Sequence, residues 1–557
     1  MQKHGEFLRS LLESRGIVDE IQAETFLNPD YVRDLHDPFL MRDMESACVR
    51  VFEAIENKEK IVIYADYDCD GIPGAVILQD LFKLVKYDNC GIYIPQRNSE
   101  GYGLNLEAIE GFVAAGVKLL ITVDLGITAV EEVAQAKIDG IDVIITDHHL
   151  PKEILPRAYA ILNPKVDEYP EKMLCGAGVA FKFVQGFLKK YREYFDIKDG
   201  VEKWVLDMAG LATLSDMVPL TGENRAIAYF GLKVFRKSPR PGLQKLLSIM
   251  KIDQKTISED DIGFMVTPRL NAASRMDDPM RAYELLSTRD EKEADVLAKH
   301  LSKINDERKS IVTTIMRDVN KKLEIDDRGI KSPLIVIGHP EWRVGILGLV
   351  AGKIMDKYNK PVFVWGKDEN ECIKGSCRSD GSVSVVELMG STATSFLEYG
   401  GHELAGGFTV HTDKIHFLEE NLCISYEKTK RDVSNAEEKK YDIKTTLDVV
   451  NMKSWNDIAK LAPFGLANSK PVFLFENVKI EKIKQFGKNG SGEHLEIIFS
   501  DSSLRSGKSV TAISFFSGLD SFKTTLTLGL PINLLATFDL SRFRGREELR
   551  LRIEEIY

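Results

Sequence analysis

The first half of the chain alternates short apolar runs with amphipathic segments. Four runs rich in isoleucine and valine predict strands: residues 61–66, 118–126, 142–149 and 158–164. The intervening segments, such as residues 74–85, have helical spacing. Continuous apolar strands separated by helices are typical of a parallel sheet covered on both faces. We therefore expect an α/β domain over residues 46–235, preceded by a helical lead-in over residues 1–45.

A helical connector and two further domains are expected beyond it. Residues 236–325 are predicted to be helical, and within 293–319 one helical stripe is apolar, formed by Leu297, Leu301, Ile304, Ile311 and Ile315. The charged outer face of this helix suits a connector between two lobes. Residues 326–431 again alternate strands and helices. Short strand patterns over residues 440–557 predict a small β-barrel.

Composition narrows the class of protein. Of 557 residues, 44% are hydrophobic and 29% charged, and the formal net charge of -11 argues against a simple polycationic nucleic-acid binder. The seven cysteines are scattered without a CxxC pair, which disfavours a zinc ribbon or a disulfide framework. Neither a signal peptide nor an apolar run of about 18 residues is present. A soluble cytoplasmic protein without membrane association is expected.

Acidic and histidine side chains gather where the predicted strands end. Asp66, Asp68 and Asp70 follow the first, Asp124 ends the second, and Asp147, His148 and His149 end the third. Ligands of open parallel sheets bind beyond these carboxyl ends. Carboxylates there repel one another unless cations lie between them, and carboxylates with imidazoles suit Mn²⁺ or Mg²⁺. A single Asp after a strand is usually a turn former, but acidic or histidine residues at three successive strand ends favour a metal site.

Asp216 is a further candidate for the same site. It interrupts the apolar stretch LATLSDMVPL, and aspartate is rarely buried without a partner. A helix terminus capped by Ser215 or Asp216 would give the same pattern. Periodicity alone leaves these two interpretations equal.

The ordered motifs resemble those of a known superfamily. The segments DYDCDG (66–71), VDLG (123–126), DHH (147–149) and SDMVPL (215–220) resemble the four motifs of the DHH phosphoesterases. Within that superfamily the chain resembles the RecJ-type single-strand-specific exonucleases, whose further hallmarks are similar to RNSEGYGL (97–104), GAGVAFK (176–182), TPRLNAASRM (267–276), GSCRS (375–379) and GGHELAGGF (400–408). The resemblance covers nearly the whole chain. It implies a parallel-sheet DHH domain, a long helix, a second α/β (DHH-associated) domain and an OB-like barrel.

The resemblance also implies a two-metal site. Two Mn²⁺ or Mg²⁺ ions would be held by Asp68, Asp70, Asp124, His148 and Asp216, with Asp124 bridging. His149 would face the scissile phosphate as a catalytic group, and Asp66 would support or join the site. Tyr64 stands where some members of the superfamily carry a metal-binding histidine.

Substrate-binding groups follow from the same resemblance. A pocket for the 5′-terminal phosphate would be formed by Arg97, Arg275, Ser376 and Arg378, with Ser376 and Arg378 on a glycine turn. Arg269 and Asn271, near Arg275, are further candidates, and His402, in a flexible glycine loop, would touch the DNA backbone. The barrel would bind single strands through groups among Phe515, Phe516, Phe538, Arg542, Phe543, Arg544 and Arg546. Ser274 and Arg343 depart from the usual family pattern.

The implied activity is a metal-dependent 5′-to-3′ exonuclease that degrades single-stranded DNA to mononucleotides in repair and recombination. Single-stranded DNA would be the main partner, a single-strand-binding protein or a helicase are candidate protein partners, and a monomer is expected. One alternative is a DHH phosphodiesterase acting on short oligonucleotides or cyclic dinucleotides, which chain-length dependence of turnover would reveal. A non-catalytic DHH scaffold is the other, and metal-dependent turnover would exclude it.

Overall fold

The computed structural model describes residues 4–166, 168–325, 331–368, 370–431, 441–487, 494–500, 508–522, 524–541 and 547–557. It consists of two compact units. One unit comprises residues 1–35, 219–229 and 435–557, and the other comprises residues 36–218 and 230–434.

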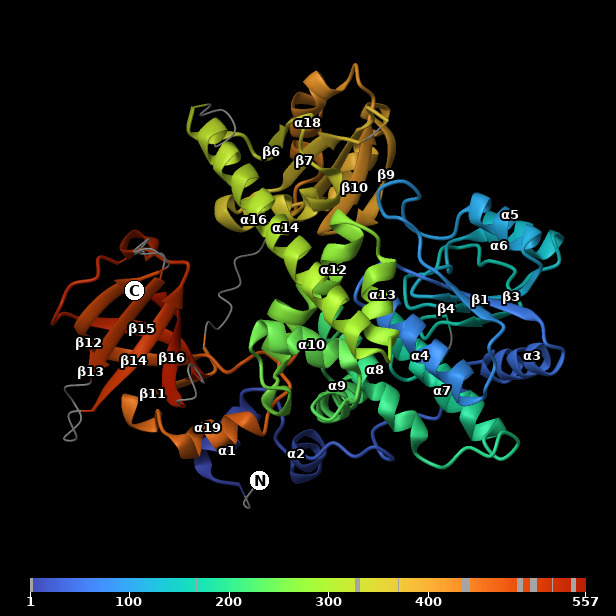
Figure 1. Ribbon diagram of the computed structural model, residues 1–557. Coiled ribbons are helices and arrows are strands. Elements are labelled where there is room, and N and C mark those ends of the chain that lie inside the picture. The colour runs from blue at the N-terminus through green and yellow to red at the C-terminus, as the bar shows by residue number, and fades with distance from the viewer. Residues whose placement is uncertain are drawn as a thin grey trace. The chain divides into compact units, whose positions relative to one another are not determined.

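A five-stranded parallel sheet begins the larger unit. Its order is β2 (Cys90–Tyr93), β1 (Lys60–Ala65), β3 (Val117–Val123), β4 (Asp142–Thr146) and β5 (Ala160–Leu162). Helices α5 (Leu106–Ala114) and α6 (Val130–Ile138) lie on one side of the sheet, and α3 (Met44–Glu56), α4 (Gly71–Leu84) and α7 (Gly176–Tyr191) lie on the other (Figure 1). The expected parallel sheet covered on both faces is therefore confirmed, with β2 as an additional edge strand.

The strand order places a binding crevice at one point of this sheet. From β1 the chain moves outward to β2 and then crosses back to β3 on the other side of β1. Neighbouring strands whose connections leave in opposite directions form a switch point, where loops diverge and open a crevice at the carboxyl ends. Asp66 follows β1 and Asp124 follows β3. The predicted acids thus lie at the switch point.

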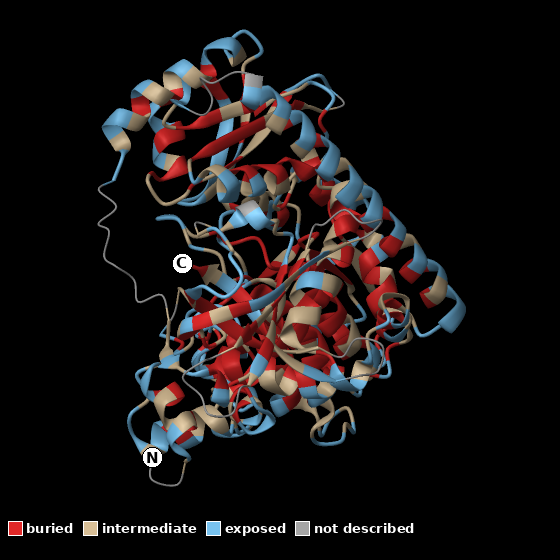
Figure 2. Ribbon diagram, turned by 90° about the vertical axis from the view of Figure 1, so that its left-hand side faces the viewer, coloured by how far each residue is buried: buried red, intermediate tan, exposed pale blue. Residues whose placement is uncertain are grey.

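Helices connect this sheet to the second lobe of the same unit. They are α8 (Leu206–Ser215), α10 (Pro241–Met250), α12 (Thr267–Met276), α13 (Met280–Ser287) and α14 (Glu291–Ile325), while the first part of α9 (Gly222–Phe235) belongs to the smaller unit. Leu301 and Ile315 of α14 are buried on its apolar stripe, while its other faces carry exposed residues (Figure 2). Helix α14 extends the predicted helix at both ends. Among the described residues no helix is both long enough and apolar enough to cross a membrane.

The second lobe contains a mixed sheet. Its order is β6 (Ile335–Gly338), β7 (Val362–Lys367), β8 (Ile373–Arg378), β10 (Ala405–Val410) and β9 (Phe396–His402). Only β6 and β7 pair in parallel, and the other pairs are antiparallel. Helices α16 (Leu347–Tyr358), α17 (Val385–Ser391) and α18 (Leu418–Thr429) pack around it. The second α/β lobe is confirmed.

Two glycine-rich segments of this lobe differ from the sequence prediction. GSCRS, expected on a glycine turn, lies at the end of β8, and GGHELAGGF, expected as a flexible loop, forms the β9–β10 hairpin. A Cβ atom at Gly375 would lie 2.1 Å from the ring of Phe408 on the paired strand. Gly375 therefore lets an aromatic ring pack against the strand. The prediction of a glycine turn did not include this packing role.

The smaller unit is built around a closed five-stranded barrel. Strands β12 (Phe473–Phe486), β13 (His494–Ser500), β14 (Ser509–Phe515), β16 (Glu548–Ile556) and β15 (Pro531–Ser541) follow one another, and β15 pairs with β12 to close it. Strand β11 (Ile443–Thr445) and α19 (Met452–Ala459) precede the barrel. Helices α1 (Glu6–Glu13) and α2 (Glu20–Leu27) join its core, where Phe7 stacks on Phe473 at 5.9 Å. The barrel was expected, but its packing against the N-terminal helices was not.

Candidate functional site

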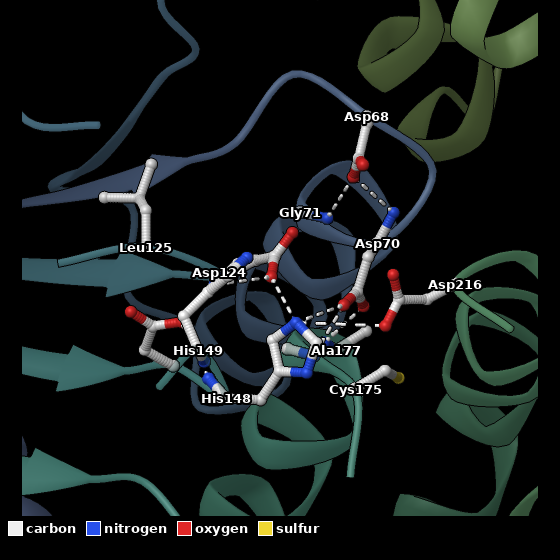
Figure 3. A network of polar contacts seen from close by, with 12 residues as sticks. Asp68, Asp70, Gly71, Asp124, Leu125, His148, His149, Cys175, Ala177 and Asp216 are labelled. Carbon is white, nitrogen blue, oxygen red and sulfur yellow. Dashed lines mark hydrogen bonds and ion pairs between the residues drawn. The ribbon is translucent and has the colours of Figure 1, made fainter. Parts of the chain in front are cut away.

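The predicted acids and histidines converge at the carboxyl ends of three parallel strands (Figure 3). Asp68 and Asp70 lie between β1 and α4, Asp124 follows β3, and His148 and His149 follow β4. Asp216 reaches the same place from the end of α8, where it is the C-cap residue. The two interpretations of Asp216 are thus both realised, because a helix end carries this carboxylate into the cluster.

His148 lies among three of these carboxylates. Its Nε2 atom is 3.1 Å from Asp124 Oδ1 and 3.8 Å from both Asp70 Oδ2 and Asp216 Oδ2. Three groups of ligand atoms come within 4.8 Å of one another: Asp70, His148 and Asp216; Asp124, His148 and His149; and Asp66, Asp68 and Asp124. Asp124 is shared by two groups. That placement is what a bridging ligand between two ions requires.

Backbone geometry fixes the direction of the carboxylates. Asp70 accepts hydrogen bonds from the N–H groups of Gly176 (2.6 Å) and Ala177 (2.7 Å) at the start of α7. Asp124 has a left-handed backbone with φ of 63°, and a Cβ at Gly176 would lie 2.5 Å from its Cβ. Only glycine allows this approach. The GAGVAFK motif therefore supports both Asp70 and Asp124.

Burial makes negative charge costly at this site in the absence of a cation. Burial and neighbouring carboxylates raise the pKa of Asp66 and of Asp124 far above the usual range. Burial, followed by repulsion from Asp68, raises the pKa of Asp70 to about 6. Burial together with Asp70 raises the pKa of Asp216 to about 9, and burial lowers the pKa of His148 to about 3. The imidazole is neutral, and the carboxylates ionise readily only when a positive charge lies close to them. Such a group of side chains is suited to binding a divalent cation.

Two buried oxygen atoms provide a test of this metal assignment. Asp66 Oδ1 and Asp124 Oδ1 are buried and accept no hydrogen bond from the described residues, although the neutral imidazole of His148 lies 3.1 Å from the second of them. Buried carboxylate oxygens normally have a hydrogen-bond donor or a metal ion as partner. Oxygen ligands combined with imidazole, without a thiolate in any of the three groups, match Mn²⁺ or Mg²⁺. The residues present therefore fit a pair of such ions.

His149 is oriented by Asp147. The Nδ1 atom of His149 is 2.8 Å from Asp147 Oδ1, and Asp147 Oδ2 accepts from the N–H of Ile127 at 2.9 Å. Burial is the largest single effect and opposes a charged imidazole, but the hydrogen bond to Asp147 and the attraction of Asp147 and Asp70 together raise the pKa of His149. Nδ1 is therefore held by Asp147, and Nε2, the other ring nitrogen, lies 3.4 Å from the hydroxyl of Tyr102.

Tyr102 also contacts His149, and the sequence did not single it out. Its hydroxyl is 3.3 Å from Nδ1 of His149 and 3.4 Å from the carbonyl of Asp124, to which it donates. The only signal for it was its place in RNSEGYGL. Tyr64 supports the same loop, because its hydroxyl donates to the carbonyl of Gly103 at 2.9 Å. The residue that departs from the superfamily pattern thus positions the loop that carries Tyr102.

Asn163 and Lys165 hold the backbone of the histidine pair. Asn163 Nδ2 donates to the carbonyl of His149 at 3.0 Å, and Lys165 Nζ donates to the carbonyl of His148. Both residues follow β5, whose carboxyl end lies beside that of β4. The sequence shows only an ordinary Asn-Pro-Lys turn, so these supports cannot be predicted without the order of the strands in the sheet.

We expect Asp147→Asn to lower kcat/KM by about 10²-fold, because an amide cannot accept hydrogen bonds at both positions and would turn the imidazole. Steady-state degradation of a labelled single strand gives this ratio, and metal titration should show that the ions still bind. Glu131→Gln, on the first turn of α6, is the control and should leave both unchanged. Full activity of the Asp147 variant would contradict the orienting role.

Three predicted phosphate-binding arginines lie near one another. Arg275 Nη1 donates to the carbonyl of Gly345 at 3.1 Å, and a Cβ at Gly345 would lie 3.2 Å from the side chain of Asn98, next to Arg97. Arg378 Nη1 donates to Ser376 Oγ at 3.3 Å. Burial and then repulsion by Arg97 lower the pKa of Arg275 to about 9, and burial lowers that of Arg378. The structure thus gathers positive groups from both lobes of the larger unit.

The other predicted contacts lie further from this group. Arg269 donates to the carbonyl of Met265 at 2.7 Å, and Asn271 Oδ1 is buried without a donor among the described residues. His402 is exposed at the end of β9. In the barrel, Phe515 and Phe516 are exposed while Phe538 belongs to the core. The remaining barrel candidates lie outside the described residues: Arg542, Phe543, Arg544 and Arg546.

Family comparisons agree with these three folded parts. Residues 60–213 match the DHH family N-terminal domain, residues 331–422 the DHHA1 domain and residues 441–555 the RecJ OB domain. The single-stranded-DNA-specific exonuclease RecJ of Bacillus subtilis is 33% identical over 98% of this chain and 67% of its own length.

Solved structures show the same fold. RecJ of Thermus thermophilus in complex with Mn²⁺ aligns with a TM-score of 0.80 at 24% identity, covering 100% of this chain and 76% of that one. An exonuclease RecJ bound to manganese aligns with a TM-score of 0.61 at 28% identity, covering 70% of this chain and 95% of that one. From its domains, its metal-suited cluster and its relatives, the chain belongs to the RecJ family of single-stranded-DNA-specific exonucleases.

Proposed function

We propose that this protein is a metal-dependent exonuclease that digests single-stranded DNA from its 5′ end and releases mononucleotides. The observation that carries the proposal is the buried cluster around Asp124, in which two acceptor-rich groups share one carboxylate next to a cluster of arginines. Repair and recombination are the processes in which such an activity would serve.

Asp68, Asp70, Asp124, His148 and Asp216 would hold two Mn²⁺ or Mg²⁺ ions, with Asp66 as support. Ions bound there stabilise negative charge on the scissile phosphate and increase the acidity of water. The protein's own task is to keep these ligands deprotonated and fixed, which the α7 amide groups do for Asp70. His149, oriented by Asp147, would donate a hydrogen bond to a phosphate oxygen as charge develops on it.

The arginines would select the end of the strand. We assign the 5′-terminal phosphate to Arg97, Arg275, Ser376 and Arg378, and further backbone contacts to Arg269, Asn271 and His402. A guanidinium desolvated by burial and repelled by other arginines gains much from a dianionic phosphate. A terminal pocket of this kind would impose the 5′-to-3′ direction.

The barrel would hold a more distant part of the strand. Phe515 is flanked by the guanidinium groups of Arg550 at 5.8 Å and Arg552 at 5.7 Å, and His494 lies 5.5 Å from its ring. Exposed rings beside cations are suited to stacking of bases and attraction of phosphates.

The domain limits expected from the sequence are proposed unchanged: 1–45, 46–235, 236–325, 326–431 and 440–557.

Purified protein with Mn²⁺ and a single strand labelled at its 3′ end tests the function. Progressive shortening from the 5′ side, stopped by EDTA and by a duplex 5′ end, is expected. Hydrolysis of dinucleotides without shortening of the long strand would instead identify a small-substrate phosphodiesterase.

We also propose that the protein acts as a monomer in the cytoplasm, with a single-strand-binding protein or a helicase as partner.

Arg378→Ala is expected to reduce the preference for a 5′ phosphate by about tenfold or more, since one charged hydrogen-bonding partner is lost. The measurement is the ratio of kcat/KM for 5′-phosphorylated and 5′-hydroxyl strands. Arg281→Ala, whose guanidinium pairs with Glu284 at 3.0 Å on α13, is the matched control. An unchanged preference in the Arg378 variant would remove this residue from the pocket.

A further inference from the structure

A chain of three side chains links two of the segments that carry the clustered acids. The thiol of Cys69, within the segment Asp68–Asp70, donates to Oγ1 of Thr267 at 4.0 Å. Oγ1 of Thr267 lies 2.6 Å from Oγ of Ser215, the residue before Asp216. Thr267 begins α12 and belongs to none of the three groups of potential metal ligands. One hydroxyl outside the cluster therefore joins two segments that build it.

The hydrogens of this chain run in one direction. Oγ of Ser215 donates to the carbonyl of Leu211 at 2.7 Å, and a hydroxyl has only one hydrogen to donate. Thr267 must therefore supply the hydrogen between itself and Ser215, while its oxygen accepts from Cys69. The link to Ser215 is short, whereas the thiol is a weak donor. A side chain without a hydroxyl at position 267 would break both links.

The backbone before α12 accompanies this unusual use of a helical threonine. The hydroxyl of a threonine in a helix commonly bonds to the carbonyl four residues earlier, but that of Thr267 bonds across to α8. A short π-helical turn, Ile262–Val266, precedes it, and the N–H of Thr267 bonds to the carbonyl of Ile262, five residues earlier. Such turns are rare and are frequent at functional sites. Thr267 is 8% exposed, so its hydroxyl needs the partner that Ser215 provides.

Asp216 is the predicted ligand that has most need of this support. Asp70 accepts from two N–H groups of α7, and Asp68 accepts from two N–H groups of its own loop. The carboxylate of Asp216 accepts no hydrogen bond from the described residues, and its side chain is 28% exposed. Its direction therefore depends on the last turn of α8, which Ser215 ties to Thr267.

We propose that Thr267 is a positioning residue of the metal centre. Through Ser215 it fixes the end of α8 that carries Asp216, and through Cys69 it steadies the loop that carries Asp70. This inference rests on the proposed function, from which it takes the metal centre, and it adds a residue that is not itself a ligand. Residues that hold a metal ligand in place typically change metal affinity by about 10- to 100-fold when they are replaced.

Thr267→Val removes the hydroxyl and keeps the branched shape of the side chain. The measurement is the binding of Mn²⁺ to the purified 557-residue chain without DNA, followed through the electron paramagnetic resonance of free Mn²⁺. We expect the dissociation constant of the ion held by Asp216 to rise by about tenfold. Thr267→Ser, which keeps the hydroxyl, should restore the affinity of the unmodified protein.

A double variant shows whether Thr267 acts through Asp216. Asp216→Asn removes the carboxylate, so adding Thr267→Val should leave the remaining Mn²⁺ binding unchanged. Two losses of affinity that simply add would overturn the route through Asp216. The same comparison in unfolding experiments does not give this result, because a purely structural defect adds to the loss of the carboxylate.

Thr392→Val is the matched control. Thr392 is also 8% exposed, and its hydroxyl donates to the carbonyl of Leu388 at 2.9 Å in the second lobe. Both valine variants should unfold at a lower temperature in EDTA, but only the Thr267 variant should bind Mn²⁺ more weakly. A lower melting temperature with unchanged Mn²⁺ affinity would overturn the inference. If Thr267→Val does not fold, Ser215→Ala breaks the same link and is expected to weaken Mn²⁺ binding in the same way.

The binding of Mn²⁺ needs no strand, so the assay separates this inference from nuclease activity. Unmodified protein that binds Mn²⁺ and shows the effect of Thr267, but degrades no single strand, would overturn the proposed function alone. Unmodified protein that binds no divalent ion would overturn both.

Discussion

Asp124→Asn is expected to abolish nuclease activity while leaving the fold at least as stable as before. Asp124 is 3% exposed and, among the described residues, is the one carboxylate shared by two groups of potential ligands, so its loss would weaken both ion sites. Asparagine has the same shape and tolerates the left-handed backbone found there. It also removes a buried carboxyl group whose ionised form is disfavoured by burial and by the neighbouring carboxylates. The turnover rate should fall by at least about 10³-fold.

Two measurements on the same preparation decide this prediction. Degradation of a 3′-labelled single strand reports activity, and thermal unfolding in EDTA reports stability of the metal-free protein. The control is Asp139→Asn, which alters an aspartate at the end of α6 outside the cluster and should leave activity unchanged. Retained turnover by the Asp124 variant would contradict the shared-ligand assignment. Loss of turnover together with a lower melting temperature would point instead to a damaged fold.

The sequence predicted the parallel sheet and most of the acidic cluster for one physical reason. Buried parallel strands need continuous apolar runs, and residues directly after those runs share one edge of the sheet. The hydrophobic pattern alone therefore associates Asp124 with His148. It does not associate Asp216 with them, because Asp216 reaches the site from the end of a helix. The hydrophobic pattern does not predict where the end of a helix lies relative to the sheet.

The features that sequence reasoning missed depend on tertiary packing. The glycines in β8 suggest a turn, but Gly375 is required by the ring of Phe408 on the neighbouring strand. Asn163 and Lys165 belong by their pattern to an ordinary turn, and only the pairing of β5 with β4 brings them to the carbonyls of the histidine pair. Side chains of the same type differ in role according to what packs against them. The amino-acid sequence alone does not show these packing partners.

Removing the divalent ions should make the protein less stable as pH rises from 7 to 9. Asp216 has a folded pKa of about 9, well above its value in an unfolded chain, and the pKa values of Asp66 and Asp124 are raised as well. A group with a raised pKa stabilises the fold fully at low pH and loses that contribution as pH rises through the folded value. His148, with its folded pKa of about 3, acts in the opposite direction only below about 6.5. Between pH 7 and 9 the carboxylates therefore determine the sign.

Thermal unfolding at several pH values, in EDTA and in Mn²⁺, measures this effect. In EDTA the melting temperature should fall from pH 7 to 9, while Mn²⁺ should raise it by an amount that grows with pH, because the ion competes with protons for the same oxygens. Asp216→Asn, which cannot ionise, should flatten the slope in EDTA and reduce the stabilisation by Mn²⁺. A melting temperature independent of pH in EDTA would mean that these carboxylates are already ionised without metal. Their mutual repulsion would then have to be relieved by water entering the site, and the burial of Asp66 and Asp124 could no longer explain a requirement for two cations.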